Sequence, residues 1–204
     1  YLLLLGWAPE GEQEIFSLDE MIKIWDPARI SKSPAIFDPL KLRAINAAYI
    51  RALPAEEFRR LADPFIDSAV HCDIDRDLLC ANLQPRCEVL EDIPPQLDFF
   101  DAVLPIDAEM YRNKKQKTTP ESAKEALTTL LPVLEAQTDW TRDAIFEACK
   151  TLAEQLEKKN GWLLFPLGIA LSGKARTPGG GTDLAAMMGR EETLKRVKAA
   201  LGKL

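Results

Sequence analysis

The sequence predicts an all-α protein, a bundle or cage of helices joined by short loops. Apolar residues recur at the spacing of a helix face, and several segments begin with the side chains that cap helices. No region shows sustained alternation with a period of two. With 204 residues, 47% of them hydrophobic, the chain is long enough for one large domain or two to three small ones.

Helix starts are clear in the first quarter of the chain. The chain opens at Tyr1, without Met, within an apparent amphipathic helix, and we therefore expect a fragment of a longer protein. Ser17-Leu18-Asp19-Glu20 is a capping box, and its helix should stop near Asp26-Pro27. Asp38 followed by Pro39 is an N-cap with a first-turn proline, which predicts a helix over residues 40–53.

The same signals continue in the second half. Thr119-Pro120 predicts a helix to about Ala136. Asp139 or Thr141 then starts a long helix that should end before Gly161. One apolar stripe on this helix is formed by Ile145, Cys149, Leu152 and Leu156.

The last quarter is less regular. Residues 162–167 form the one strand-like run, and six residues do not distinguish a helix from a strand. Thr182 or Asp183 should cap a short helix to Met188. Gly189 should break that helix before a last one over residues 191–201.

Charge is distributed unevenly along the chain. The net charge is −6, yet the residues from Lys158 onward carry nine Lys or Arg against three acidic residues. Residues 87–110 contain seven acidic residues and no basic one. Such segregation can steer a polyanion to one face, although ordinary solvated helices produce the same pattern. The net negative charge argues against a protein that coats nucleic acid, and no DNA partner is expected.

Metal-binding and catalytic residues are not recognisable. The four cysteines form no C-x-x-C pair, and the only histidine, His71, completes no ligand set, so no metal site is predicted. A lone histidine without an evident nucleophile is not assigned as a general base, so no catalytic residue is predicted either. The longest apolar run, residues 2–5, is too short to cross a bilayer, and no membrane partner is expected.

Two segments look like nucleotide-binding motifs. Residues 30–33 read ISKS, one residue from the KMSKS loop that holds ATP phosphates in many class I aminoacyl-tRNA synthetases. The partner motif of that loop needs two histidines, and the chain has one. Residues 168–175 have the G-x-x-x-x-G-K spacing of a P-loop, but Ala175 replaces the required Ser or Thr. The first segment is not predicted to bind a nucleotide, and the second fits a P-loop poorly.

Three consecutive glycines, residues 179–181, follow Thr177-Pro178. They lack the strand and the spacing of a dinucleotide-binding fingerprint. They predict a tight backbone path whose N–H groups can donate hydrogen bonds to a phosphate or a base edge. The alternative is a plain linker.

Several short sequence segments, taken in order, resemble the later part of bacterial glutamyl-tRNA synthetase. The resemblance spans essentially the whole chain and is more specific than any one motif. The segments that carry the resemblance most clearly are YLLLLGWAP at residues 1–9, SKSPAIFD at 31–38, QPR at 84–86, DWT at 139–141, PLGIALSG at 166–173, TPG at 177–179 and GREETL at 189–194.

This resemblance implies the tRNA-binding, non-catalytic part of such an enzyme. Residues 1–53 would be the end of the stem-contact domain. Two helical subdomains that bind the anticodon would follow, at residues 54–103 and 104–204. ATP and Mg²⁺ would serve the missing catalytic domain, with no cofactor in this part. The implied partner is tRNA(Glu), and the implied protein is a cytoplasmic monomer.

The resemblance also implies site residues. Arg86 matches the arginine that the family uses at the third anticodon base, where its planar fork of donors suits the acceptors of cytosine. Glutamate anticodons end in C and glutamine anticodons in G, so Arg86 indicates a discriminating enzyme. A surface arginine without this role is the alternative.

Gly168 departs from the family pattern. Many relatives carry an arginine here that contacts the first anticodon base, and glycine has no side chain to do so. Lys174 or Arg176, from the neighbouring loop, is the expected substitute. Thr177, Pro178 and Gly179 match the family's anticodon-contacting loop.

Two other functions remain open from the sequence. The first is a helical protein-interaction module that uses the acidic residues 87–110 and binds no RNA. The second is a nucleotide-binding enzyme built on residues 168–174.

Overall fold

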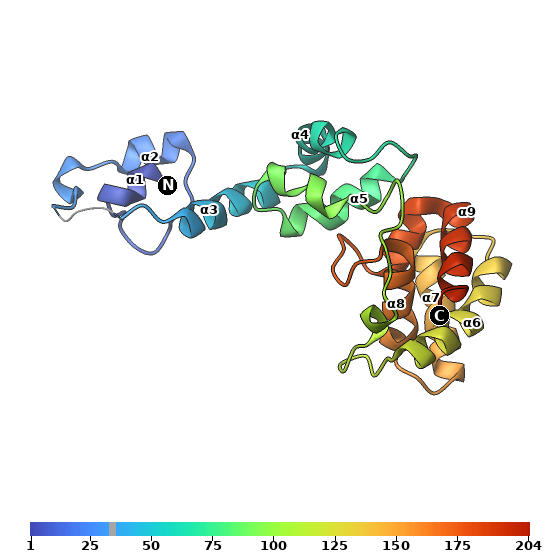
Figure 1. The fold of residues 1–204 in the computed structure, drawn as a ribbon. Helices are drawn as coiled ribbons and strands as arrows, with labels where there is room; N and C mark the ends of the chain where they lie inside the picture. Colours follow the sequence, from blue (N-terminus) through green and yellow to red (C-terminus); the bar gives the residue numbers. More distant parts are fainter. Residues whose placement is uncertain (33–35) are drawn as a thin grey trace.

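The computed structural model describes residues 1–32 and 36–204, so Ser33 of the KMSKS-like segment lies outside the described residues. Over the described residues the chain is helical, with two isolated β-bridges and no strand, which confirms the all-α prediction. Figure 1 shows a curved row of three parts: α1–α3 at one end, α4 and α5 in the middle, and a bundle of α6–α9 at the other end.

The first part contains α1 (Leu2–Gly6), α2 (Leu18–Ile24) and α3 (Pro39–Ala52). The predicted capping box at Ser17 is present, and Asp38 caps α3 through the N–H groups of Leu40 and Lys41. Trp7 is buried and its indole N–H donates to the Asp26 carbonyl at 2.9 Å. Among the described residues, the exposed large hydrophobic side chains all lie within residues 2–49.

The middle part contains two helices that the sequence patterns did not single out, α4 (Ala55–Asp67) and α5 (Arg76–Leu83). α4 contains Pro64, which weakens the helix signal, and α5 is only eight residues long. α4 nevertheless buries Phe58, Ala62 and Ile66 at intervals of four residues. The short 3-10 helices Gln84–Arg86, Leu90–Asp92, Pro94–Gln96 and Ala108–Tyr111 then lead to the bundle.

The bundle contains α6 (Pro120–Ala136), α7 (Arg142–Gln155), α8 (Asn160–Ser172) and α9 (Gly181–Leu201). Residues 162–167 are part of α8, which packs against the other three helices. α8 is apolar on nearly every side because other elements cover nearly every side of it, and this hides its helical period in the sequence.

Helix ends in the bundle agree with the predictions in part. Thr119 and Thr141 are the N-caps of α6 and α7, and Gly189 breaks α9 with a φ of 77°. Gly161, however, lies inside α8, and the residue with positive φ after α7 is Glu157, at 53°. The N-cap of α9 is Gly180 instead of Thr182 or Asp183.

A buried arginine holds the bundle to the segment that enters it. Arg196 of α9 is 3% exposed, and its guanidinium donates to the carbonyls of Phe99, Phe100 and Leu171 at 2.6–2.7 Å. Its Nε also donates to Glu192 at 2.8 Å. A buried guanidinium is stable only when such acceptors surround it, so Arg196 fixes the end of α8 relative to residues 99–100.

Candidate nucleic-acid interface

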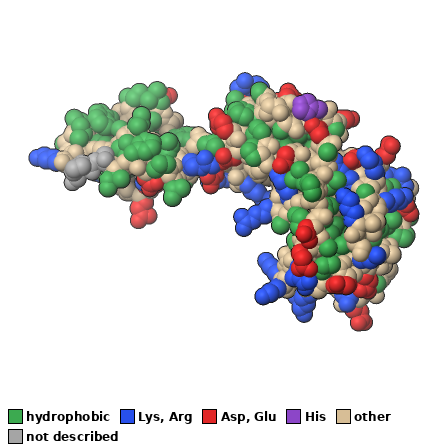
Figure 2. Space-filling model, viewed as in Figure 1, with side chains coloured by type: hydrophobic (Ala, Val, Ile, Leu, Met, Phe, Trp, Pro, Cys, Tyr) green, Lys and Arg blue, Asp and Glu red, His purple; other side chains and the backbone are tan. Residues whose placement is uncertain are grey.

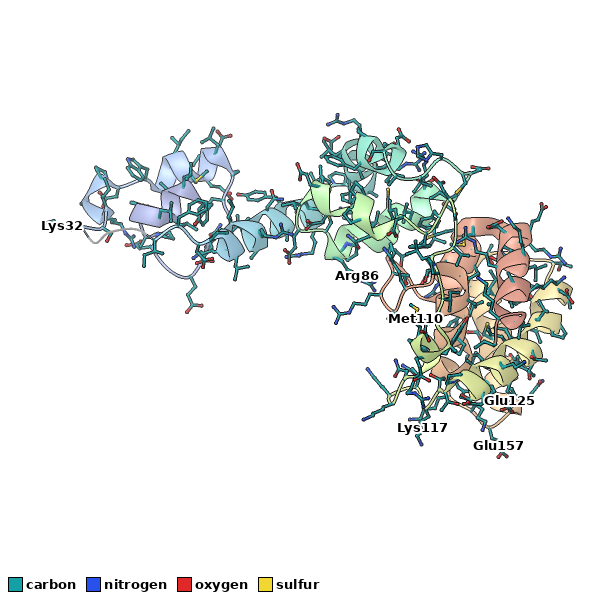
Figure 3. The ribbon with its side chains drawn as sticks, viewed as in Figure 1. Lys32, Arg86, Met110, Lys117, Glu125 and Glu157 are labelled. Atoms are coloured by element: carbon teal, nitrogen blue, oxygen red, sulfur yellow. The ribbon has the colours of Figure 1, made fainter. Side chains whose placement is uncertain are left out.

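A pocket of about 690 Å³ lies where the middle part meets the bundle. The seven residues singled out in the sequence gather here from segments far apart in the chain. Arg86, Gly168, Lys174, Arg176, Thr177 and Gly179 line the pocket, and the carbonyl of Pro178 is bonded to Arg86. Figure 3 shows Arg86 where the helices of the middle part approach the bundle.

Arg86 is held by a compact local structure. It ends the 3-10 helix Gln84–Arg86, whose Gln84 side chain donates to the carbonyls of Ile50 and Leu53 at 3.0 and 2.8 Å. Arg86 Nη1 donates to the Pro178 carbonyl at 3.0 Å and more weakly to Thr177 at 3.5 Å. Its Nε and Nη2 have no acceptor among the described residues, so three N–H donors remain for a ligand.

The loop of residues 173–180 is shaped by local backbone geometry. Gly173 ends α8 in the left-handed region with a φ of 70°, and a side chain here would lie 2.7 Å from the Leu104 carbonyl. Residues 168–172 are helical, so the P-loop-like segment does not form a phosphate-wrapping loop. Thr177 Oγ1 donates to the Gly179 carbonyl at 2.6 Å.

The two basic residues proposed to compensate for Gly168 differ in their surroundings. Lys174 forms an ion pair with Asp98, and its Nζ donates to the Pro95 carbonyl at 2.9 Å. Arg176 is exposed and has no partner among the described residues. Arg176 is therefore the residue whose charge remains available at the mouth of the pocket.

The far wall contains two residues, Arg142 and Phe146, that no sequence pattern singled out. Arg142 of α7 donates to Asp183 at 3.1 Å and lies over the Phe146 ring, 5.5 Å from its centroid. Asp183 also accepts the Gly180 N–H at 2.7 Å, so this glycine N–H is not free for a ligand. The i, i+4 spacing of Arg142 and Phe146 was visible in the sequence, but nothing indicated that this face lines a pocket.

A sequence model of the anticodon binding domain matches residues 42–201. The chain belongs to this family. The glutamate–tRNA ligase of Clostridium botulinum (strain Hall) is 45% identical over 204 residues, which are 100% of this chain and 42% of that protein. The glutamate–tRNA ligase of Clostridium acetobutylicum is 42% identical over 205 residues, with the same two coverages.

A solved structure of a glutamate tRNA ligase has a similar fold over nearly the whole of this chain. The crystal structure of a glutamate tRNA ligase from Elizabethkingia meningosepticum in complex with its amino acid has a TM-score of 0.83 at 27% identity. The alignment covers 98% of this chain and 39% of that chain. The chain thus spans about two fifths of the length of the curated relatives it matches.

The acidic residues 87–110 of this anticodon-binding domain are mostly engaged within the chain. Arg43 pairs with Glu88 and Asp92, Lys174 with Asp98, and Arg112 with Glu109. Asp107 caps the 3-10 helix Ala108–Tyr111. Asp101 binds His71 Nδ1 at 2.6 Å and two backbone N–H groups, and these hydrogen bonds lower its pKa to about 2. This internal pairing leaves little free charge for an acidic docking surface.

The cysteines of the anticodon-binding domain are free thiols. Cys149 is fully buried, and burial raises its pKa to about 12, so it is an unreactive core residue. Among the described residues no group of three or more His, Cys, Asp or Glu is placed to hold a metal ion. No helix in the described part of the chain is both long and apolar enough to cross a membrane.

The contact between α8 and α9 under the pocket allows a matched pair of glycine substitutions. A Cβ at Gly181 would lie 2.6 Å from the Leu164 carbonyl and 3.0 Å from Gly168 N, whereas a Cβ at Gly168 would meet nothing closer than 3.8 Å. We expect Gly181→Ala to lower the free energy of unfolding by about 1–3 kcal/mol, because α8 and α9 must separate. Gly168→Ala should be neutral or stabilising by up to about 1 kcal/mol, because alanine favours the helix. Urea unfolding of both variants measures the difference, and equal stabilities would contradict this close packing.

Proposed function

We propose that this chain is the part of a glutamate–tRNA ligase that binds the anticodon arm of tRNA(Glu). The observation that carries the proposal is the pocket in which Arg86, Arg176 and the 177–179 loop come together. Proteins recognise single-stranded RNA through bases that leave their stack and enter such pockets, where the bases contact arginine and aromatic side chains. Membership of the anticodon-binding domain family supports the same conclusion.

In this proposal, Arg86 contacts the third anticodon base and the 177–179 loop contacts its neighbours. Arg176, which is exposed and unpaired in the described part of the chain, substitutes at the first base for the side chain that Gly168 lacks. Lys174 supports the loop through its ion pair with Asp98 and has no direct contact with RNA.

The resemblance to glutamyl-tRNA synthetases supports a division of the chain into three parts. Residues 1–53 are the end of the stem-contact domain, and residues 54–103 and 104–204 are the two subdomains that hold the anticodon. Activation of glutamate with ATP and Mg²⁺ takes place outside residues 1–204, in a cytoplasmic enzyme that acts as a monomer. Pyrophosphate exchange that depends on glutamate should therefore not be detectable with this chain alone.

Binding of tRNA(Glu) to the purified chain at several salt concentrations tests the proposal. Lysines and arginines that neutralise phosphates release counterions, so the affinity should fall roughly ten- to hundred-fold between about 50 and 200 mM salt. An acidic protein-interaction module would not bind the tRNA at the lowest salt concentration. Absence of binding there would therefore contradict the proposed function.

A further inference from the structure

Residues 113–118 form a loop, the lysine loop, whose lysine charges are unpaired within the described part of the chain. Lys114, Lys115 and Lys117 are all exposed, and none has an ion-pair or hydrogen-bond partner for its ammonium group among the described residues. The adjacent Arg112, by contrast, makes a two-bond ion pair with Glu109. Three unpaired charges therefore lie within four residues.

The backbone of the lysine loop is held rigidly. Asn113 and Thr118 exchange two backbone hydrogen bonds of 3.0 Å, and Asn113 Oδ1 accepts the N–H groups of Lys115 and Gln116 at 3.0 and 3.1 Å. The buried Thr118 hydroxyl donates to the Tyr111 carbonyl at 2.7 Å. Lys117 adopts a φ of 56°, which ordinary residues accept only where surrounding contacts impose it. The three lysines are thus presented from a fixed turn.

The lysine loop adjoins the pocket described above. Gln116 lines this pocket, and its side chain lies so close to Gly161 of α8 that a Cβ there would clash with it. Figure 3 shows Lys117 at the opposite end of the bundle from Arg86, on the same side in that view. Figure 2 shows Lys and Arg side chains along this edge of the bundle.

The basic residues after position 158 are less available than their number suggests. Lys195 pairs with Glu192, Lys198 pairs with Glu135, and Arg196 is buried. Arg190 donates to the Glu135 carbonyl, and Lys174 pairs with Asp98. Five of the eight basic residues after position 158 are thus engaged within the chain, and the lysine loop adds three unpaired charges beside the pocket to that of Arg176.

We propose that the lysine loop binds the sugar–phosphate backbone of the RNA whose bases enter the pocket. This inference rests on the proposed function. Bases that turn into a pocket leave their phosphates outside it, along the rim where the lysine loop lies. The lysine ammonium is a compact charge on a flexible stem, suited to phosphate contacts that fix position and carry no base specificity.

The test compares Lys114→Gln/Lys115→Gln with the control variant Lys195→Gln/Lys198→Gln, which removes two charges that are already paired. Lys117 is left unchanged because of its positive φ. Affinity for tRNA(Glu) is measured against salt concentration. Each lost phosphate contact should flatten the slope of log affinity against log salt by about 0.7 to 0.9, so the lysine-loop variant should lose about 1.5 in slope. The control should keep the slope of the unmodified chain.

The readouts separate this inference from the proposed function. If the unmodified chain does not bind tRNA(Glu), the proposed function fails. If it binds and the lysine-loop variant keeps the control's slope, the lysine loop does not contact phosphates, whether or not affinity has fallen. The preference for a third-base cytosine over guanine should be unchanged in the lysine-loop variant. A loss of that preference would mean that the lysine loop reads bases, which would overturn the proposal.

Discussion

Replacing Arg86 by Gln will weaken binding of tRNA(Glu) and reduce its preference over tRNA(Gln) by about ten-fold or more. The guanidinium keeps Nε and Nη2 free for a base while Nη1 is bonded to the Pro178 carbonyl, and glutamine has neither the charge nor the fork. A charged hydrogen-bonding contact of this kind contributes about 1.5–3 kcal/mol, which corresponds to at least ten-fold in affinity. Filter binding with the two tRNAs measures the ratio.

Lys is the matched control at this position. Arg86→Lys keeps the charge that attracts phosphate but presents a single ammonium in place of the planar fork. We expect it to lose base preference while retaining most of its affinity at low salt. Circular dichroism must show that both variants are folded. An affinity ratio that stays the same in a folded Gln variant would make Arg86 a structural residue that only supports the 177–178 backbone.

The largest loss of stability is expected for Arg196→Met. This substitution leaves the carbonyls of Phe99, Phe100 and Leu171 without their donor in a buried site. Breaking such a buried charged network costs about 3–5 kcal/mol, even though methionine fills much of the volume. Urea unfolding should show a lower midpoint at an unchanged slope.

Arg190→Met on the same helix is the control for this substitution. Arg190 is exposed and donates one hydrogen bond, to the Glu135 carbonyl at 2.6 Å. Its loss should cost less than about 1 kcal/mol. If Arg196→Met is no more destabilising than this control, the buried guanidinium does not hold the bundle to residues 99–100.

Local features of the fold were predictable because they depend on residues close together in the sequence. The caps at Ser17, Asp38, Thr119 and Thr141 each involve a side chain and an N–H group within three residues of it. The helical state of residues 162–167 was not predictable, since α8 is buried on nearly every side and its apolar period is lost. α5 was missed because a helix of eight residues gives little pattern to detect.

The site was predictable only through resemblance to a family. Arg86 and Pro178 are 92 residues apart, and no local pattern indicates that they meet. No sequence rule indicates the ion pair of Lys174 with Asp98 either. Because this pair engages Lys174, Arg176 is the better candidate for an RNA contact. Arg142 and Phe146 carry no motif at all, and only the packing of α7 beside α9 brings them to the pocket.

If the pocket between the middle part and the bundle binds the anticodon, isolated arms of the tRNA should compete unequally for the chain. In a competition experiment, labelled tRNA(Glu) is bound to the chain, and its anticodon stem-loop or its acceptor arm is added as the competitor. The anticodon stem-loop should displace it, with an affinity that falls at least about ten-fold when guanine replaces cytosine at the third anticodon base. Displacement by the acceptor arm with no effect of the stem-loop would contradict anticodon binding in this pocket.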